Sequence, residues 1–271
     1  MRVESPIRMR NGGWLHKTTD ALAAPKRPDR LRVKKATDTE LHVRFGPLCR
    51  AWYVGQDQAV KRLAKTLGVA PWALDQLHVG FDGVAFIFPE QNHCGQIVGV
   101  NRRHADGKKL CVVGSRRGLT YAEDWCDAPG PILVVEGGSD VAAGLTLGLC
   151  VVGRPSNTGG VEYLTRLLGK HDRRIILVAE RDEKDRSQLG LIHDPDCRCC
   201  GMCYPGLHGA RVSAERLTKQ LGRLIHWSFL PMPHKDLRAW LVGKRLDLDD
   251  TGRLERIGKI LCRRLIDGIH E

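Results

Sequence analysis

The segment Pro131–Asp140 constrains the fold of this chain more than any other segment. Its apolar run Ile132–Val135 is β-branched at three of four positions, which is typical of a strand buried on both faces of a parallel sheet. Glu136 and two glycines follow, and Ser139 is placed to cap a helix over 140–147. A carboxylate at the carboxyl end of such a strand lies where open α/β sheets bind ligands. An ordinary acidic turn has the same local pattern, so residues elsewhere must decide between the two.

Strand and helix patterns alternate from this segment to the end of the chain. Such alternation predicts βαβ units and a parallel sheet. We expect strands at 131–136, 149–152, 173–179 and 223–229, and helices at 139–148, 159–169, about 209–221, near Asp236 and at 251–267.

The segment ahead of this sheet combines helices with a β-meander. Two short helices are expected between 51 and 77, where Gly68 ends the first and Pro71 begins the second. Strands at 84–88, 96–103 and 108–113 follow, and Asp106-Gly107 is a strong hairpin signal. We therefore predict an α+β subdomain over 51–128, a parallel-sheet domain over 129–245 with an insertion at 186–208, and a terminal helix over 246–271.

The charge of the chain is strongly basic, at +12, and is concentrated near the N-terminus. Residues 1–50 hold twelve Lys or Arg against five Asp or Glu and so supply +7. Prolines at 25, 28 and 47 and weak periodicity predict a flexible, extended arm here. Contact with nucleic acid and a merely solvated leader are equally compatible with this composition.

Basic side chains also surround the predicted hairpin. Two glycines beside them permit close approach of a phosphate backbone, which favours phosphate binding over a solvated hairpin end. The residues concerned are Arg102, Arg103, Lys108, Lys109, Arg116 and Arg117.

Carboxylates follow two further strands of the predicted sheet. Glu180 and Asp182 come directly after the strand at 173–179, and Asp236 follows the last strand. Because the carboxyl ends of parallel strands share one edge, these acids and Glu136 should converge there. Two carboxylates about 4 Å apart repel by roughly 4 kcal/mol at an effective dielectric constant of 20. Such a group therefore requires protons or a hard divalent cation, which predicts Mg²⁺ or Mn²⁺.

A cysteine-rich segment interrupts the domain after these acids. Cys197, Cys200 and Cys203 are spaced as in zinc knuckles, with His193 or His208 as the fourth ligand and Cys199 as an alternative. We predict a structural Zn²⁺. Reduced free thiols and an iron–sulfur cluster are the other interpretations.

Taken together, these motifs resemble the TOPRIM domain of bacterial and phage-type DNA primases. The resemblance rests on Val135-Glu-Gly-Gly-Ser-Asp140, Glu180-Arg-Asp182, Lys235-Asp236 and the basic hairpin. It implies that Glu136 is the catalytic acid/base, that Asp140 supports it, and that Glu180, Asp182 and Asp236 hold the metal. It also implies that Lys235 and the hairpin cations bind template and nucleotide.

Two features depart from the pattern of this family. Glu180 stands where an aspartate is usual, and the glycine that normally follows the acid pair closely is delayed, by our reading to Gly209. The N-terminal zinc ribbon and a Walker A motif are also missing, so we expect any helicase to be a separate protein.

The function implied by the resemblance is a primase-like nucleotidyltransferase that acts on single-stranded DNA and nucleoside triphosphates. A TOPRIM nuclease and a non-catalytic nucleic-acid-binding replication accessory are the alternatives. The chain has no apolar run of membrane-spanning length and no signal-peptide core, so we expect no membrane partner and a cytoplasmic location.

Overall fold

A computed structural model describes residues 7–8, 14–15, 35–183 and 203–270. The chain divides into two units, residues 1–36 and residues 37–271. In the first unit, β1 (Ile7–Arg8) pairs antiparallel with β2 (Trp14–Leu15). None of the helices in the described ranges is both long and apolar enough to cross a membrane.

The second unit begins with a helix, α1 (Asp38–Tyr53), which corrects the prediction of an extended arm through residue 50. Thr37 and Glu40 form a reciprocal capping box at its start. Leu41, Phe45 and Cys49 recur at helical spacing and are buried. The sequence did not predict this helix because proline removes one helical hydrogen bond and Pro47 lies inside it. Burial of the apolar stripe outweighs that loss.

The rest of the N-terminal part matches the predicted α+β pattern. Helix α2 (Asp57–Leu67) ends at Gly68, which has φ +68°, and α3 (Pro71–Gln76) begins at its proline. Strands β3 (Gly80–Phe81), β4 (Phe86–Gln91), β5 (Ile97–Arg103) and β6 (Lys109–Cys111) form an antiparallel sheet in that order. The hairpin between β5 and β6 turns at Gly107, which has φ +86°, as predicted.

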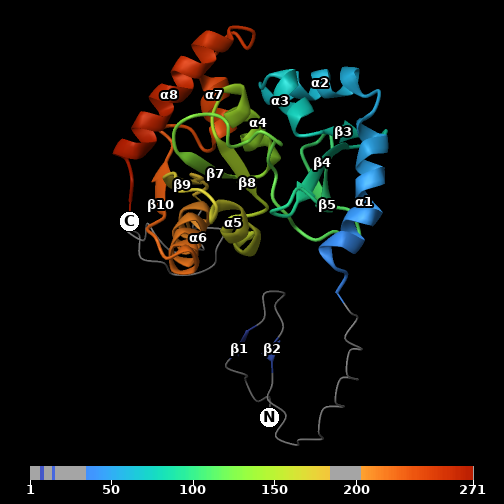
Figure 1. The fold of residues 1–271 in the computed structure, drawn as a ribbon, viewed down its shortest axis with the longest axis horizontal. Helices are drawn as coiled ribbons and strands as arrows, with labels where there is room; N and C mark the ends of the chain where they lie inside the picture. Colours follow the sequence, from blue (N-terminus) through green and yellow to red (C-terminus); the bar gives the residue numbers. More distant parts are fainter. Residues whose placement is uncertain (1–6, 9–13, 16–34, 184–202, 271) are drawn as a thin grey trace, which may run out of the picture. The chain divides into compact units, whose positions relative to one another are not determined.

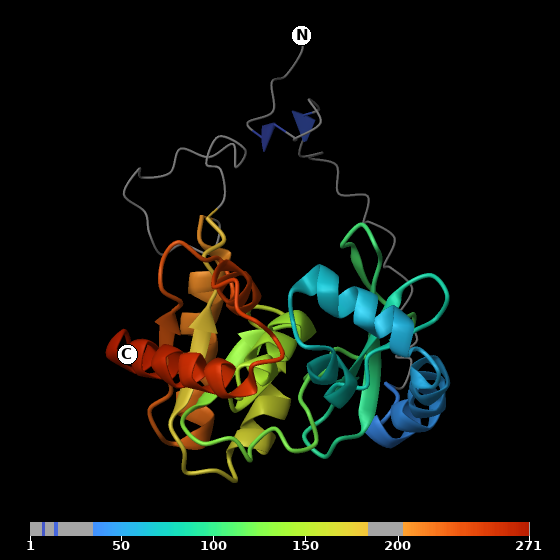
Figure 2. The same ribbon diagram turned by 90° about the horizontal axis from the view of Figure 1, so that it is seen from above.

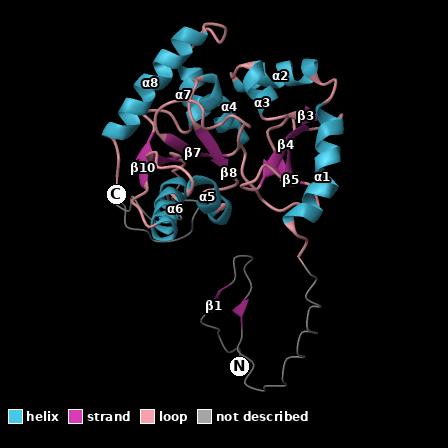
Figure 3. Ribbon diagram, in the orientation of Figure 1, coloured by secondary structure: helices cyan, strands magenta, loops and turns pink. Residues whose placement is uncertain are grey.

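The C-terminal part is a parallel sheet between two layers of helices (Figure 1). Its strands run in the order β10-β9-β7-β8, all parallel. Helices α4, α7 and α8 lie on one face of the sheet, and α5 and α6 lie on the other (Figures 1 and 3). The strands are β7 (Ile132–Glu136), β8 (Val151–Arg154), β9 (Ile175–Ala179) and β10 (His226–Phe229), and the helices are α4 (Gly138–Thr146), α5 (Val161–Leu168), α6 (Pro205–Leu221), α7 (Leu237–Gly243) and α8 (Thr251–Asp267).

The two sheets stand side by side within the second unit, and a short segment links them (Figure 2). Leu119 pairs with Gln91 at the end of β4, and Thr120 pairs with Gly153 of β8. Gly138 packs so tightly against Phe88 that an added Cβ would lie 2.5 Å from its ring. The basic sheet therefore lies directly against the turn that follows Glu136.

Candidate active site

Glu136 ends the buried strand β7, and the turn after it starts helix α4. The N-cap is Gly137, whose φ of +78° favours glycine. Our prediction that Ser139 caps this helix is wrong, because the helix begins at Gly138 and Ser139 lies inside its first turn. Asp140, one residue further, is buried.

Three carboxylates meet beside this turn on the face of the sheet that carries α4 and α7. Asp140, Glu180 and Asp236 each place an oxygen within 4.8 Å of the others. Asp236 is also the N-cap of α7, where it accepts a hydrogen bond from the Ala239 amide at 2.7 Å. Oxygen ligands at this spacing suit Mg²⁺ or Mn²⁺. The donor set therefore fits the predicted ion, although Asp140 rather than Asp182 completes the cluster.

Asp182 instead faces α6, on the other side of the sheet. Its Oδ1 accepts a hydrogen bond from the Gly206 amide at 2.7 Å. A Cβ on Gly206 would lie 2.6 Å from both Asp182 Oδ1 and the Glu180 carbonyl oxygen. Gly206, and not the predicted Gly209, is therefore the glycine that packs against the acid pair. Sequence distance misled the prediction because the cysteine-rich segment enters between Asp182 and Gly206.

Crowding and burial raise the proton affinity of this acidic edge. Burial raises the pKa of Glu136, and the nearby charge of Arg154 opposes that shift. Burial, and then the charge of Asp236, raises the pKa of Asp140 well above its usual range. Burial, followed by repulsion from Glu136, raises the pKa of Glu180 to about 7. A divalent cation would relieve this repulsion and displace the protons.

Cations of the antiparallel sheet share a cleft with Glu136. The cleft has a volume of about 170 Å³ and is lined from β4, β5, β6 and the 136–139 turn. Arg103 and Lys109 reach it, and Lys109 Nζ would lie 3.9 Å from a Cβ on Gly137. No ion pair of either side chain is found among the described residues. These two cations are therefore available to an anionic ligand.

Three of the other predicted phosphate-binding arginines have an acidic partner within the chain. Arg102 pairs with Asp82 at 2.6 Å, and Arg116 pairs with Asp38. Arg117 pairs with Glu90, which is 3% exposed, and also donates to the Pro155 carbonyl. The sequence could not reveal these partners, because each lies at least 20 residues away.

Two basic residues of the C-terminal part also approach the acids. Lys235 Nζ lies 3.6 Å from Glu180 Oε2, which agrees with the prediction that Lys235 lies beside the acids. Arg238, which we did not predict, donates its amide to Asp140 Oδ1 at 2.9 Å, and its charge acts on Arg103. Its position two residues after Asp236 was the available signal. Lys108, by contrast, is exposed at the hairpin tip.

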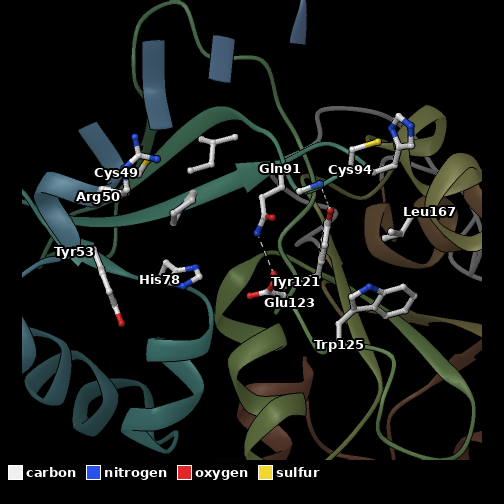
Figure 4. Close-up of a pocket in the computed structure, with 14 residues that line it drawn as sticks. Cys49, Arg50, Tyr53, His78, Gln91, Cys94, Tyr121, Glu123, Trp125 and Leu167 are labelled. Atoms are coloured by element: carbon white, nitrogen blue, oxygen red, sulfur yellow. Dashed lines mark hydrogen bonds between the residues drawn. The ribbon is translucent and has the colours of Figure 1, made fainter. Parts of the chain in front are cut away.

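A cavity of about 700 Å³ lies elsewhere in the described part of the chain (Figure 4). Pro89, Gln91 and Ile97 line it from β4 and β5. Because side chains alternate along a strand, Pro89 and Gln91 point to the face opposite Phe88 and Glu90 of the Glu136 cleft. Ile97 joins them because it pairs with Gln91 beyond a register shift between β4 and β5. The residues that line this cavity do not include Glu136, Asp140, Glu180, Asp182 or Asp236, so we do not assign the chemistry to it.

The predicted zinc ligands fall mostly outside the described residues. His193, Cys197, Cys199 and Cys200 all lie there. Cys203 is buried just before α6. His208 lies in the first turn of α6, and its buried Nδ1 has no hydrogen-bond partner in the described part of the chain. The zinc site stays a prediction.

The fold and its acidic edge define a class of protein: a four-stranded parallel sheet with clustered carboxylates, preceded by an antiparallel sheet that carries the basic hairpin. No protein-family model and no curated protein matches this chain. Solved structures do match, and they are catalytic cores of DNA primases. A DnaG primase catalytic domain bound to single-stranded DNA aligns with a TM-score of 0.53 and 16% identity over 80% of each chain.

Two further structures are similar to the same extent. The Escherichia coli primase catalytic core aligns with a TM-score of 0.51 and 16% identity over 80% of each chain. The second is the RNA polymerase domain of Mycobacterium tuberculosis primase in complex with a double-stranded DNA oligomer with an overhang. It aligns with a TM-score of 0.52 and 13% identity over 87% of this chain and 82% of that one. The chain has the fold of a bacterial primase catalytic core.

Proposed function

We propose that this protein is a primase-like nucleotidyltransferase, which joins nucleotides on a single-stranded DNA template with the help of a divalent metal. The observation that carries the proposal is the cleft that Glu136 shares with Arg103 and Lys109. A TOPRIM nuclease needs the acids alone. Polymerisation also needs nucleotide phosphates held beside them, which the two cations can do.

Each residue of the site has a role in this chemistry. Glu136, whose pKa is raised by burial, accepts the proton of the attacking hydroxyl. Arg103 and Lys109 bind phosphate oxygens and orient the nucleotide. Asp140, Glu180 and Asp236 would hold Mg²⁺ or Mn²⁺. When bound, that ion neutralises charge on the triphosphate and polarises the hydroxyl.

The partners follow from the same cleft and from one similar structure. Single-stranded DNA is bound by the DnaG catalytic domain that shares this fold. The basic charge of +12 favours such a polyanionic template here.

The proposal is tested by incubating the protein with single-stranded DNA, labelled nucleoside triphosphates and Mg²⁺ or Mn²⁺. We expect labelled oligomers, and their loss in Glu136→Gln with the fold unchanged. Glu123→Gln is the matched control, because Glu123 lines the other cavity. Shortened template would indicate the nuclease instead, and DNA binding without either product would indicate the accessory.

A further inference from the structure

Arg154 is a fully buried arginine at the end of β8, next to the acidic edge. It is 0% exposed, and Glu136 is its register partner in β7. Residues paired in register on parallel strands point to the same face of the sheet. Arg154 and Glu136 therefore lie on the α6 face, where Asp182 binds the Gly206 amide.

The guanidinium of Arg154 is only partly satisfied by hydrogen bonds. Nη1 donates to the Asn157 carbonyl, to the Gly209 carbonyl at 3.2 Å and to Ser213 Oγ at 3.1 Å. Nε and Nη2 are buried and have no hydrogen-bond partner among the residues that the structure describes. Within the described ranges no carboxylate lies within 4.0 Å of this arginine.

An arginine cannot escape such a position by losing its proton. A buried and unpaired charge is strongly destabilising unless other charges balance it. The charges that act on Arg154 are those of Glu136 and Glu180. The negative charge of the acidic edge thus balances Arg154. Because Arg154 does not lose its proton, it is a permanent positive charge beside that edge.

The sheet divides the five carboxylates into two groups with different cations. Asp140, Glu180 and Asp236 form the cluster on the α4 face, with Lys235 and Arg238 beside it. Glu136 and Asp182 lie on the α6 face, where the fixed positive charge is Arg154. A divalent ion is attracted to the first group, whereas Arg154 repels one from the second.

We propose that Arg154 takes the place of a second metal ion, so that this site binds one divalent cation per chain. Arg154 is then a positioning residue that supplies a fixed positive charge beside Glu136. The inference rests on the metal site of the proposed function, but not on polymerase activity.

The test counts ions with Mn²⁺ alone, without nucleotide or DNA, from the electron paramagnetic resonance signal of free Mn²⁺. We expect one ion on the wild-type protein and none on Glu180→Gln. Arg154→Met should bind a second ion at least about tenfold more tightly than the wild-type protein does, since one repelling charge is gone. Arg154→Lys keeps the charge and should still bind one.

Arg173→Met is the matched control for Arg154→Met. Arg173 also donates to backbone carbonyls, those of Cys126, Ala128 and Gly130, but at the opposite edge of the sheet. It should leave the count at one. Two ions of similar affinity on the wild-type protein, or a folded Arg154→Met that still binds one, would overturn the role of Arg154.

The wild-type count decides the inference even where Arg154→Met does not fold. No ion on the wild-type protein would overturn the metal site of the proposed function together with this inference. Two ions would overturn the inference alone.

Discussion

Glu180 should destabilise the metal-free protein at neutral and alkaline pH. Burial and the neighbouring Glu136 raise its pKa from 4.5 to about 7 in the folded state. The folded protein then binds a proton more tightly than the unfolded chain between these two values. Stability is therefore lost as the pH rises from about 4.5 to 7. At 1.36 kcal/mol per pKa unit, the loss above pH 7 amounts to about 3 kcal/mol.

The substitution Glu180→Gln removes the ionisable group and nearly preserves its shape. Without metal, we expect the variant to be more stable than the wild-type protein by about 3 kcal/mol at pH 8, and equally stable near pH 4.5. Saturating Mn²⁺ should narrow or reverse this difference, because ligand at 100 times Kd stabilises the wild-type protein by about 2.7 kcal/mol.

Urea denaturation with EDTA at pH 5 and pH 8 measures both expectations. Glu162→Gln is the control, because Glu162 is exposed and its helical pair with Arg166 contributes only about 0.2–0.5 kcal/mol. A Glu180→Gln variant that is less stable than the wild-type protein at pH 8 without metal would refute the electrostatic argument.

Three further predictions concern other parts of the chain. Arg117→Ala should lower the free energy of unfolding by about 3 kcal/mol in urea denaturation, because it leaves a buried carboxylate unpaired; Lys109→Ala should leave stability unchanged and reduce the salt slope of single-stranded DNA binding by about 0.7. A stable Arg117→Ala variant, or a Lys109→Ala variant that loses stability and keeps the wild-type salt slope, would contradict these roles. Phe45→Ala should lower the free energy of unfolding by about 3–5 kcal/mol in the same urea experiment. A loss below about 1 kcal/mol would show that α1 does not contribute to the core. Elemental analysis should find about one zinc per chain and none in a Cys200→Ser/Cys203→Ser double variant; metal-free wild-type protein would exclude the zinc site.

The sequence alone determined the order of elements from α2 onward and the place of the acids at strand ends. These features depend on local patterns: an apolar run makes a buried strand, and a glycine or proline ends or begins a helix. Strands joined by helical crossovers run parallel, so Glu136, Glu180 and Asp236 had to share an edge. The sequence did not predict helix α1, because Pro47 is a local signal against a helix and opposed the apolar spacing.

Only the tertiary structure decided which charges meet. It grouped Asp140 with Glu180 and Asp236, moved Asp182 to the opposite face, and brought Gly206 rather than Gly209 to the acid pair. It also paired Arg117 with Glu90 and buried Arg154 behind the site. A charged residue has the same appearance in a sequence whether it is exposed, paired or buried. Its role depends on partners brought close by the packing of distant segments, and no local pattern encodes that proximity.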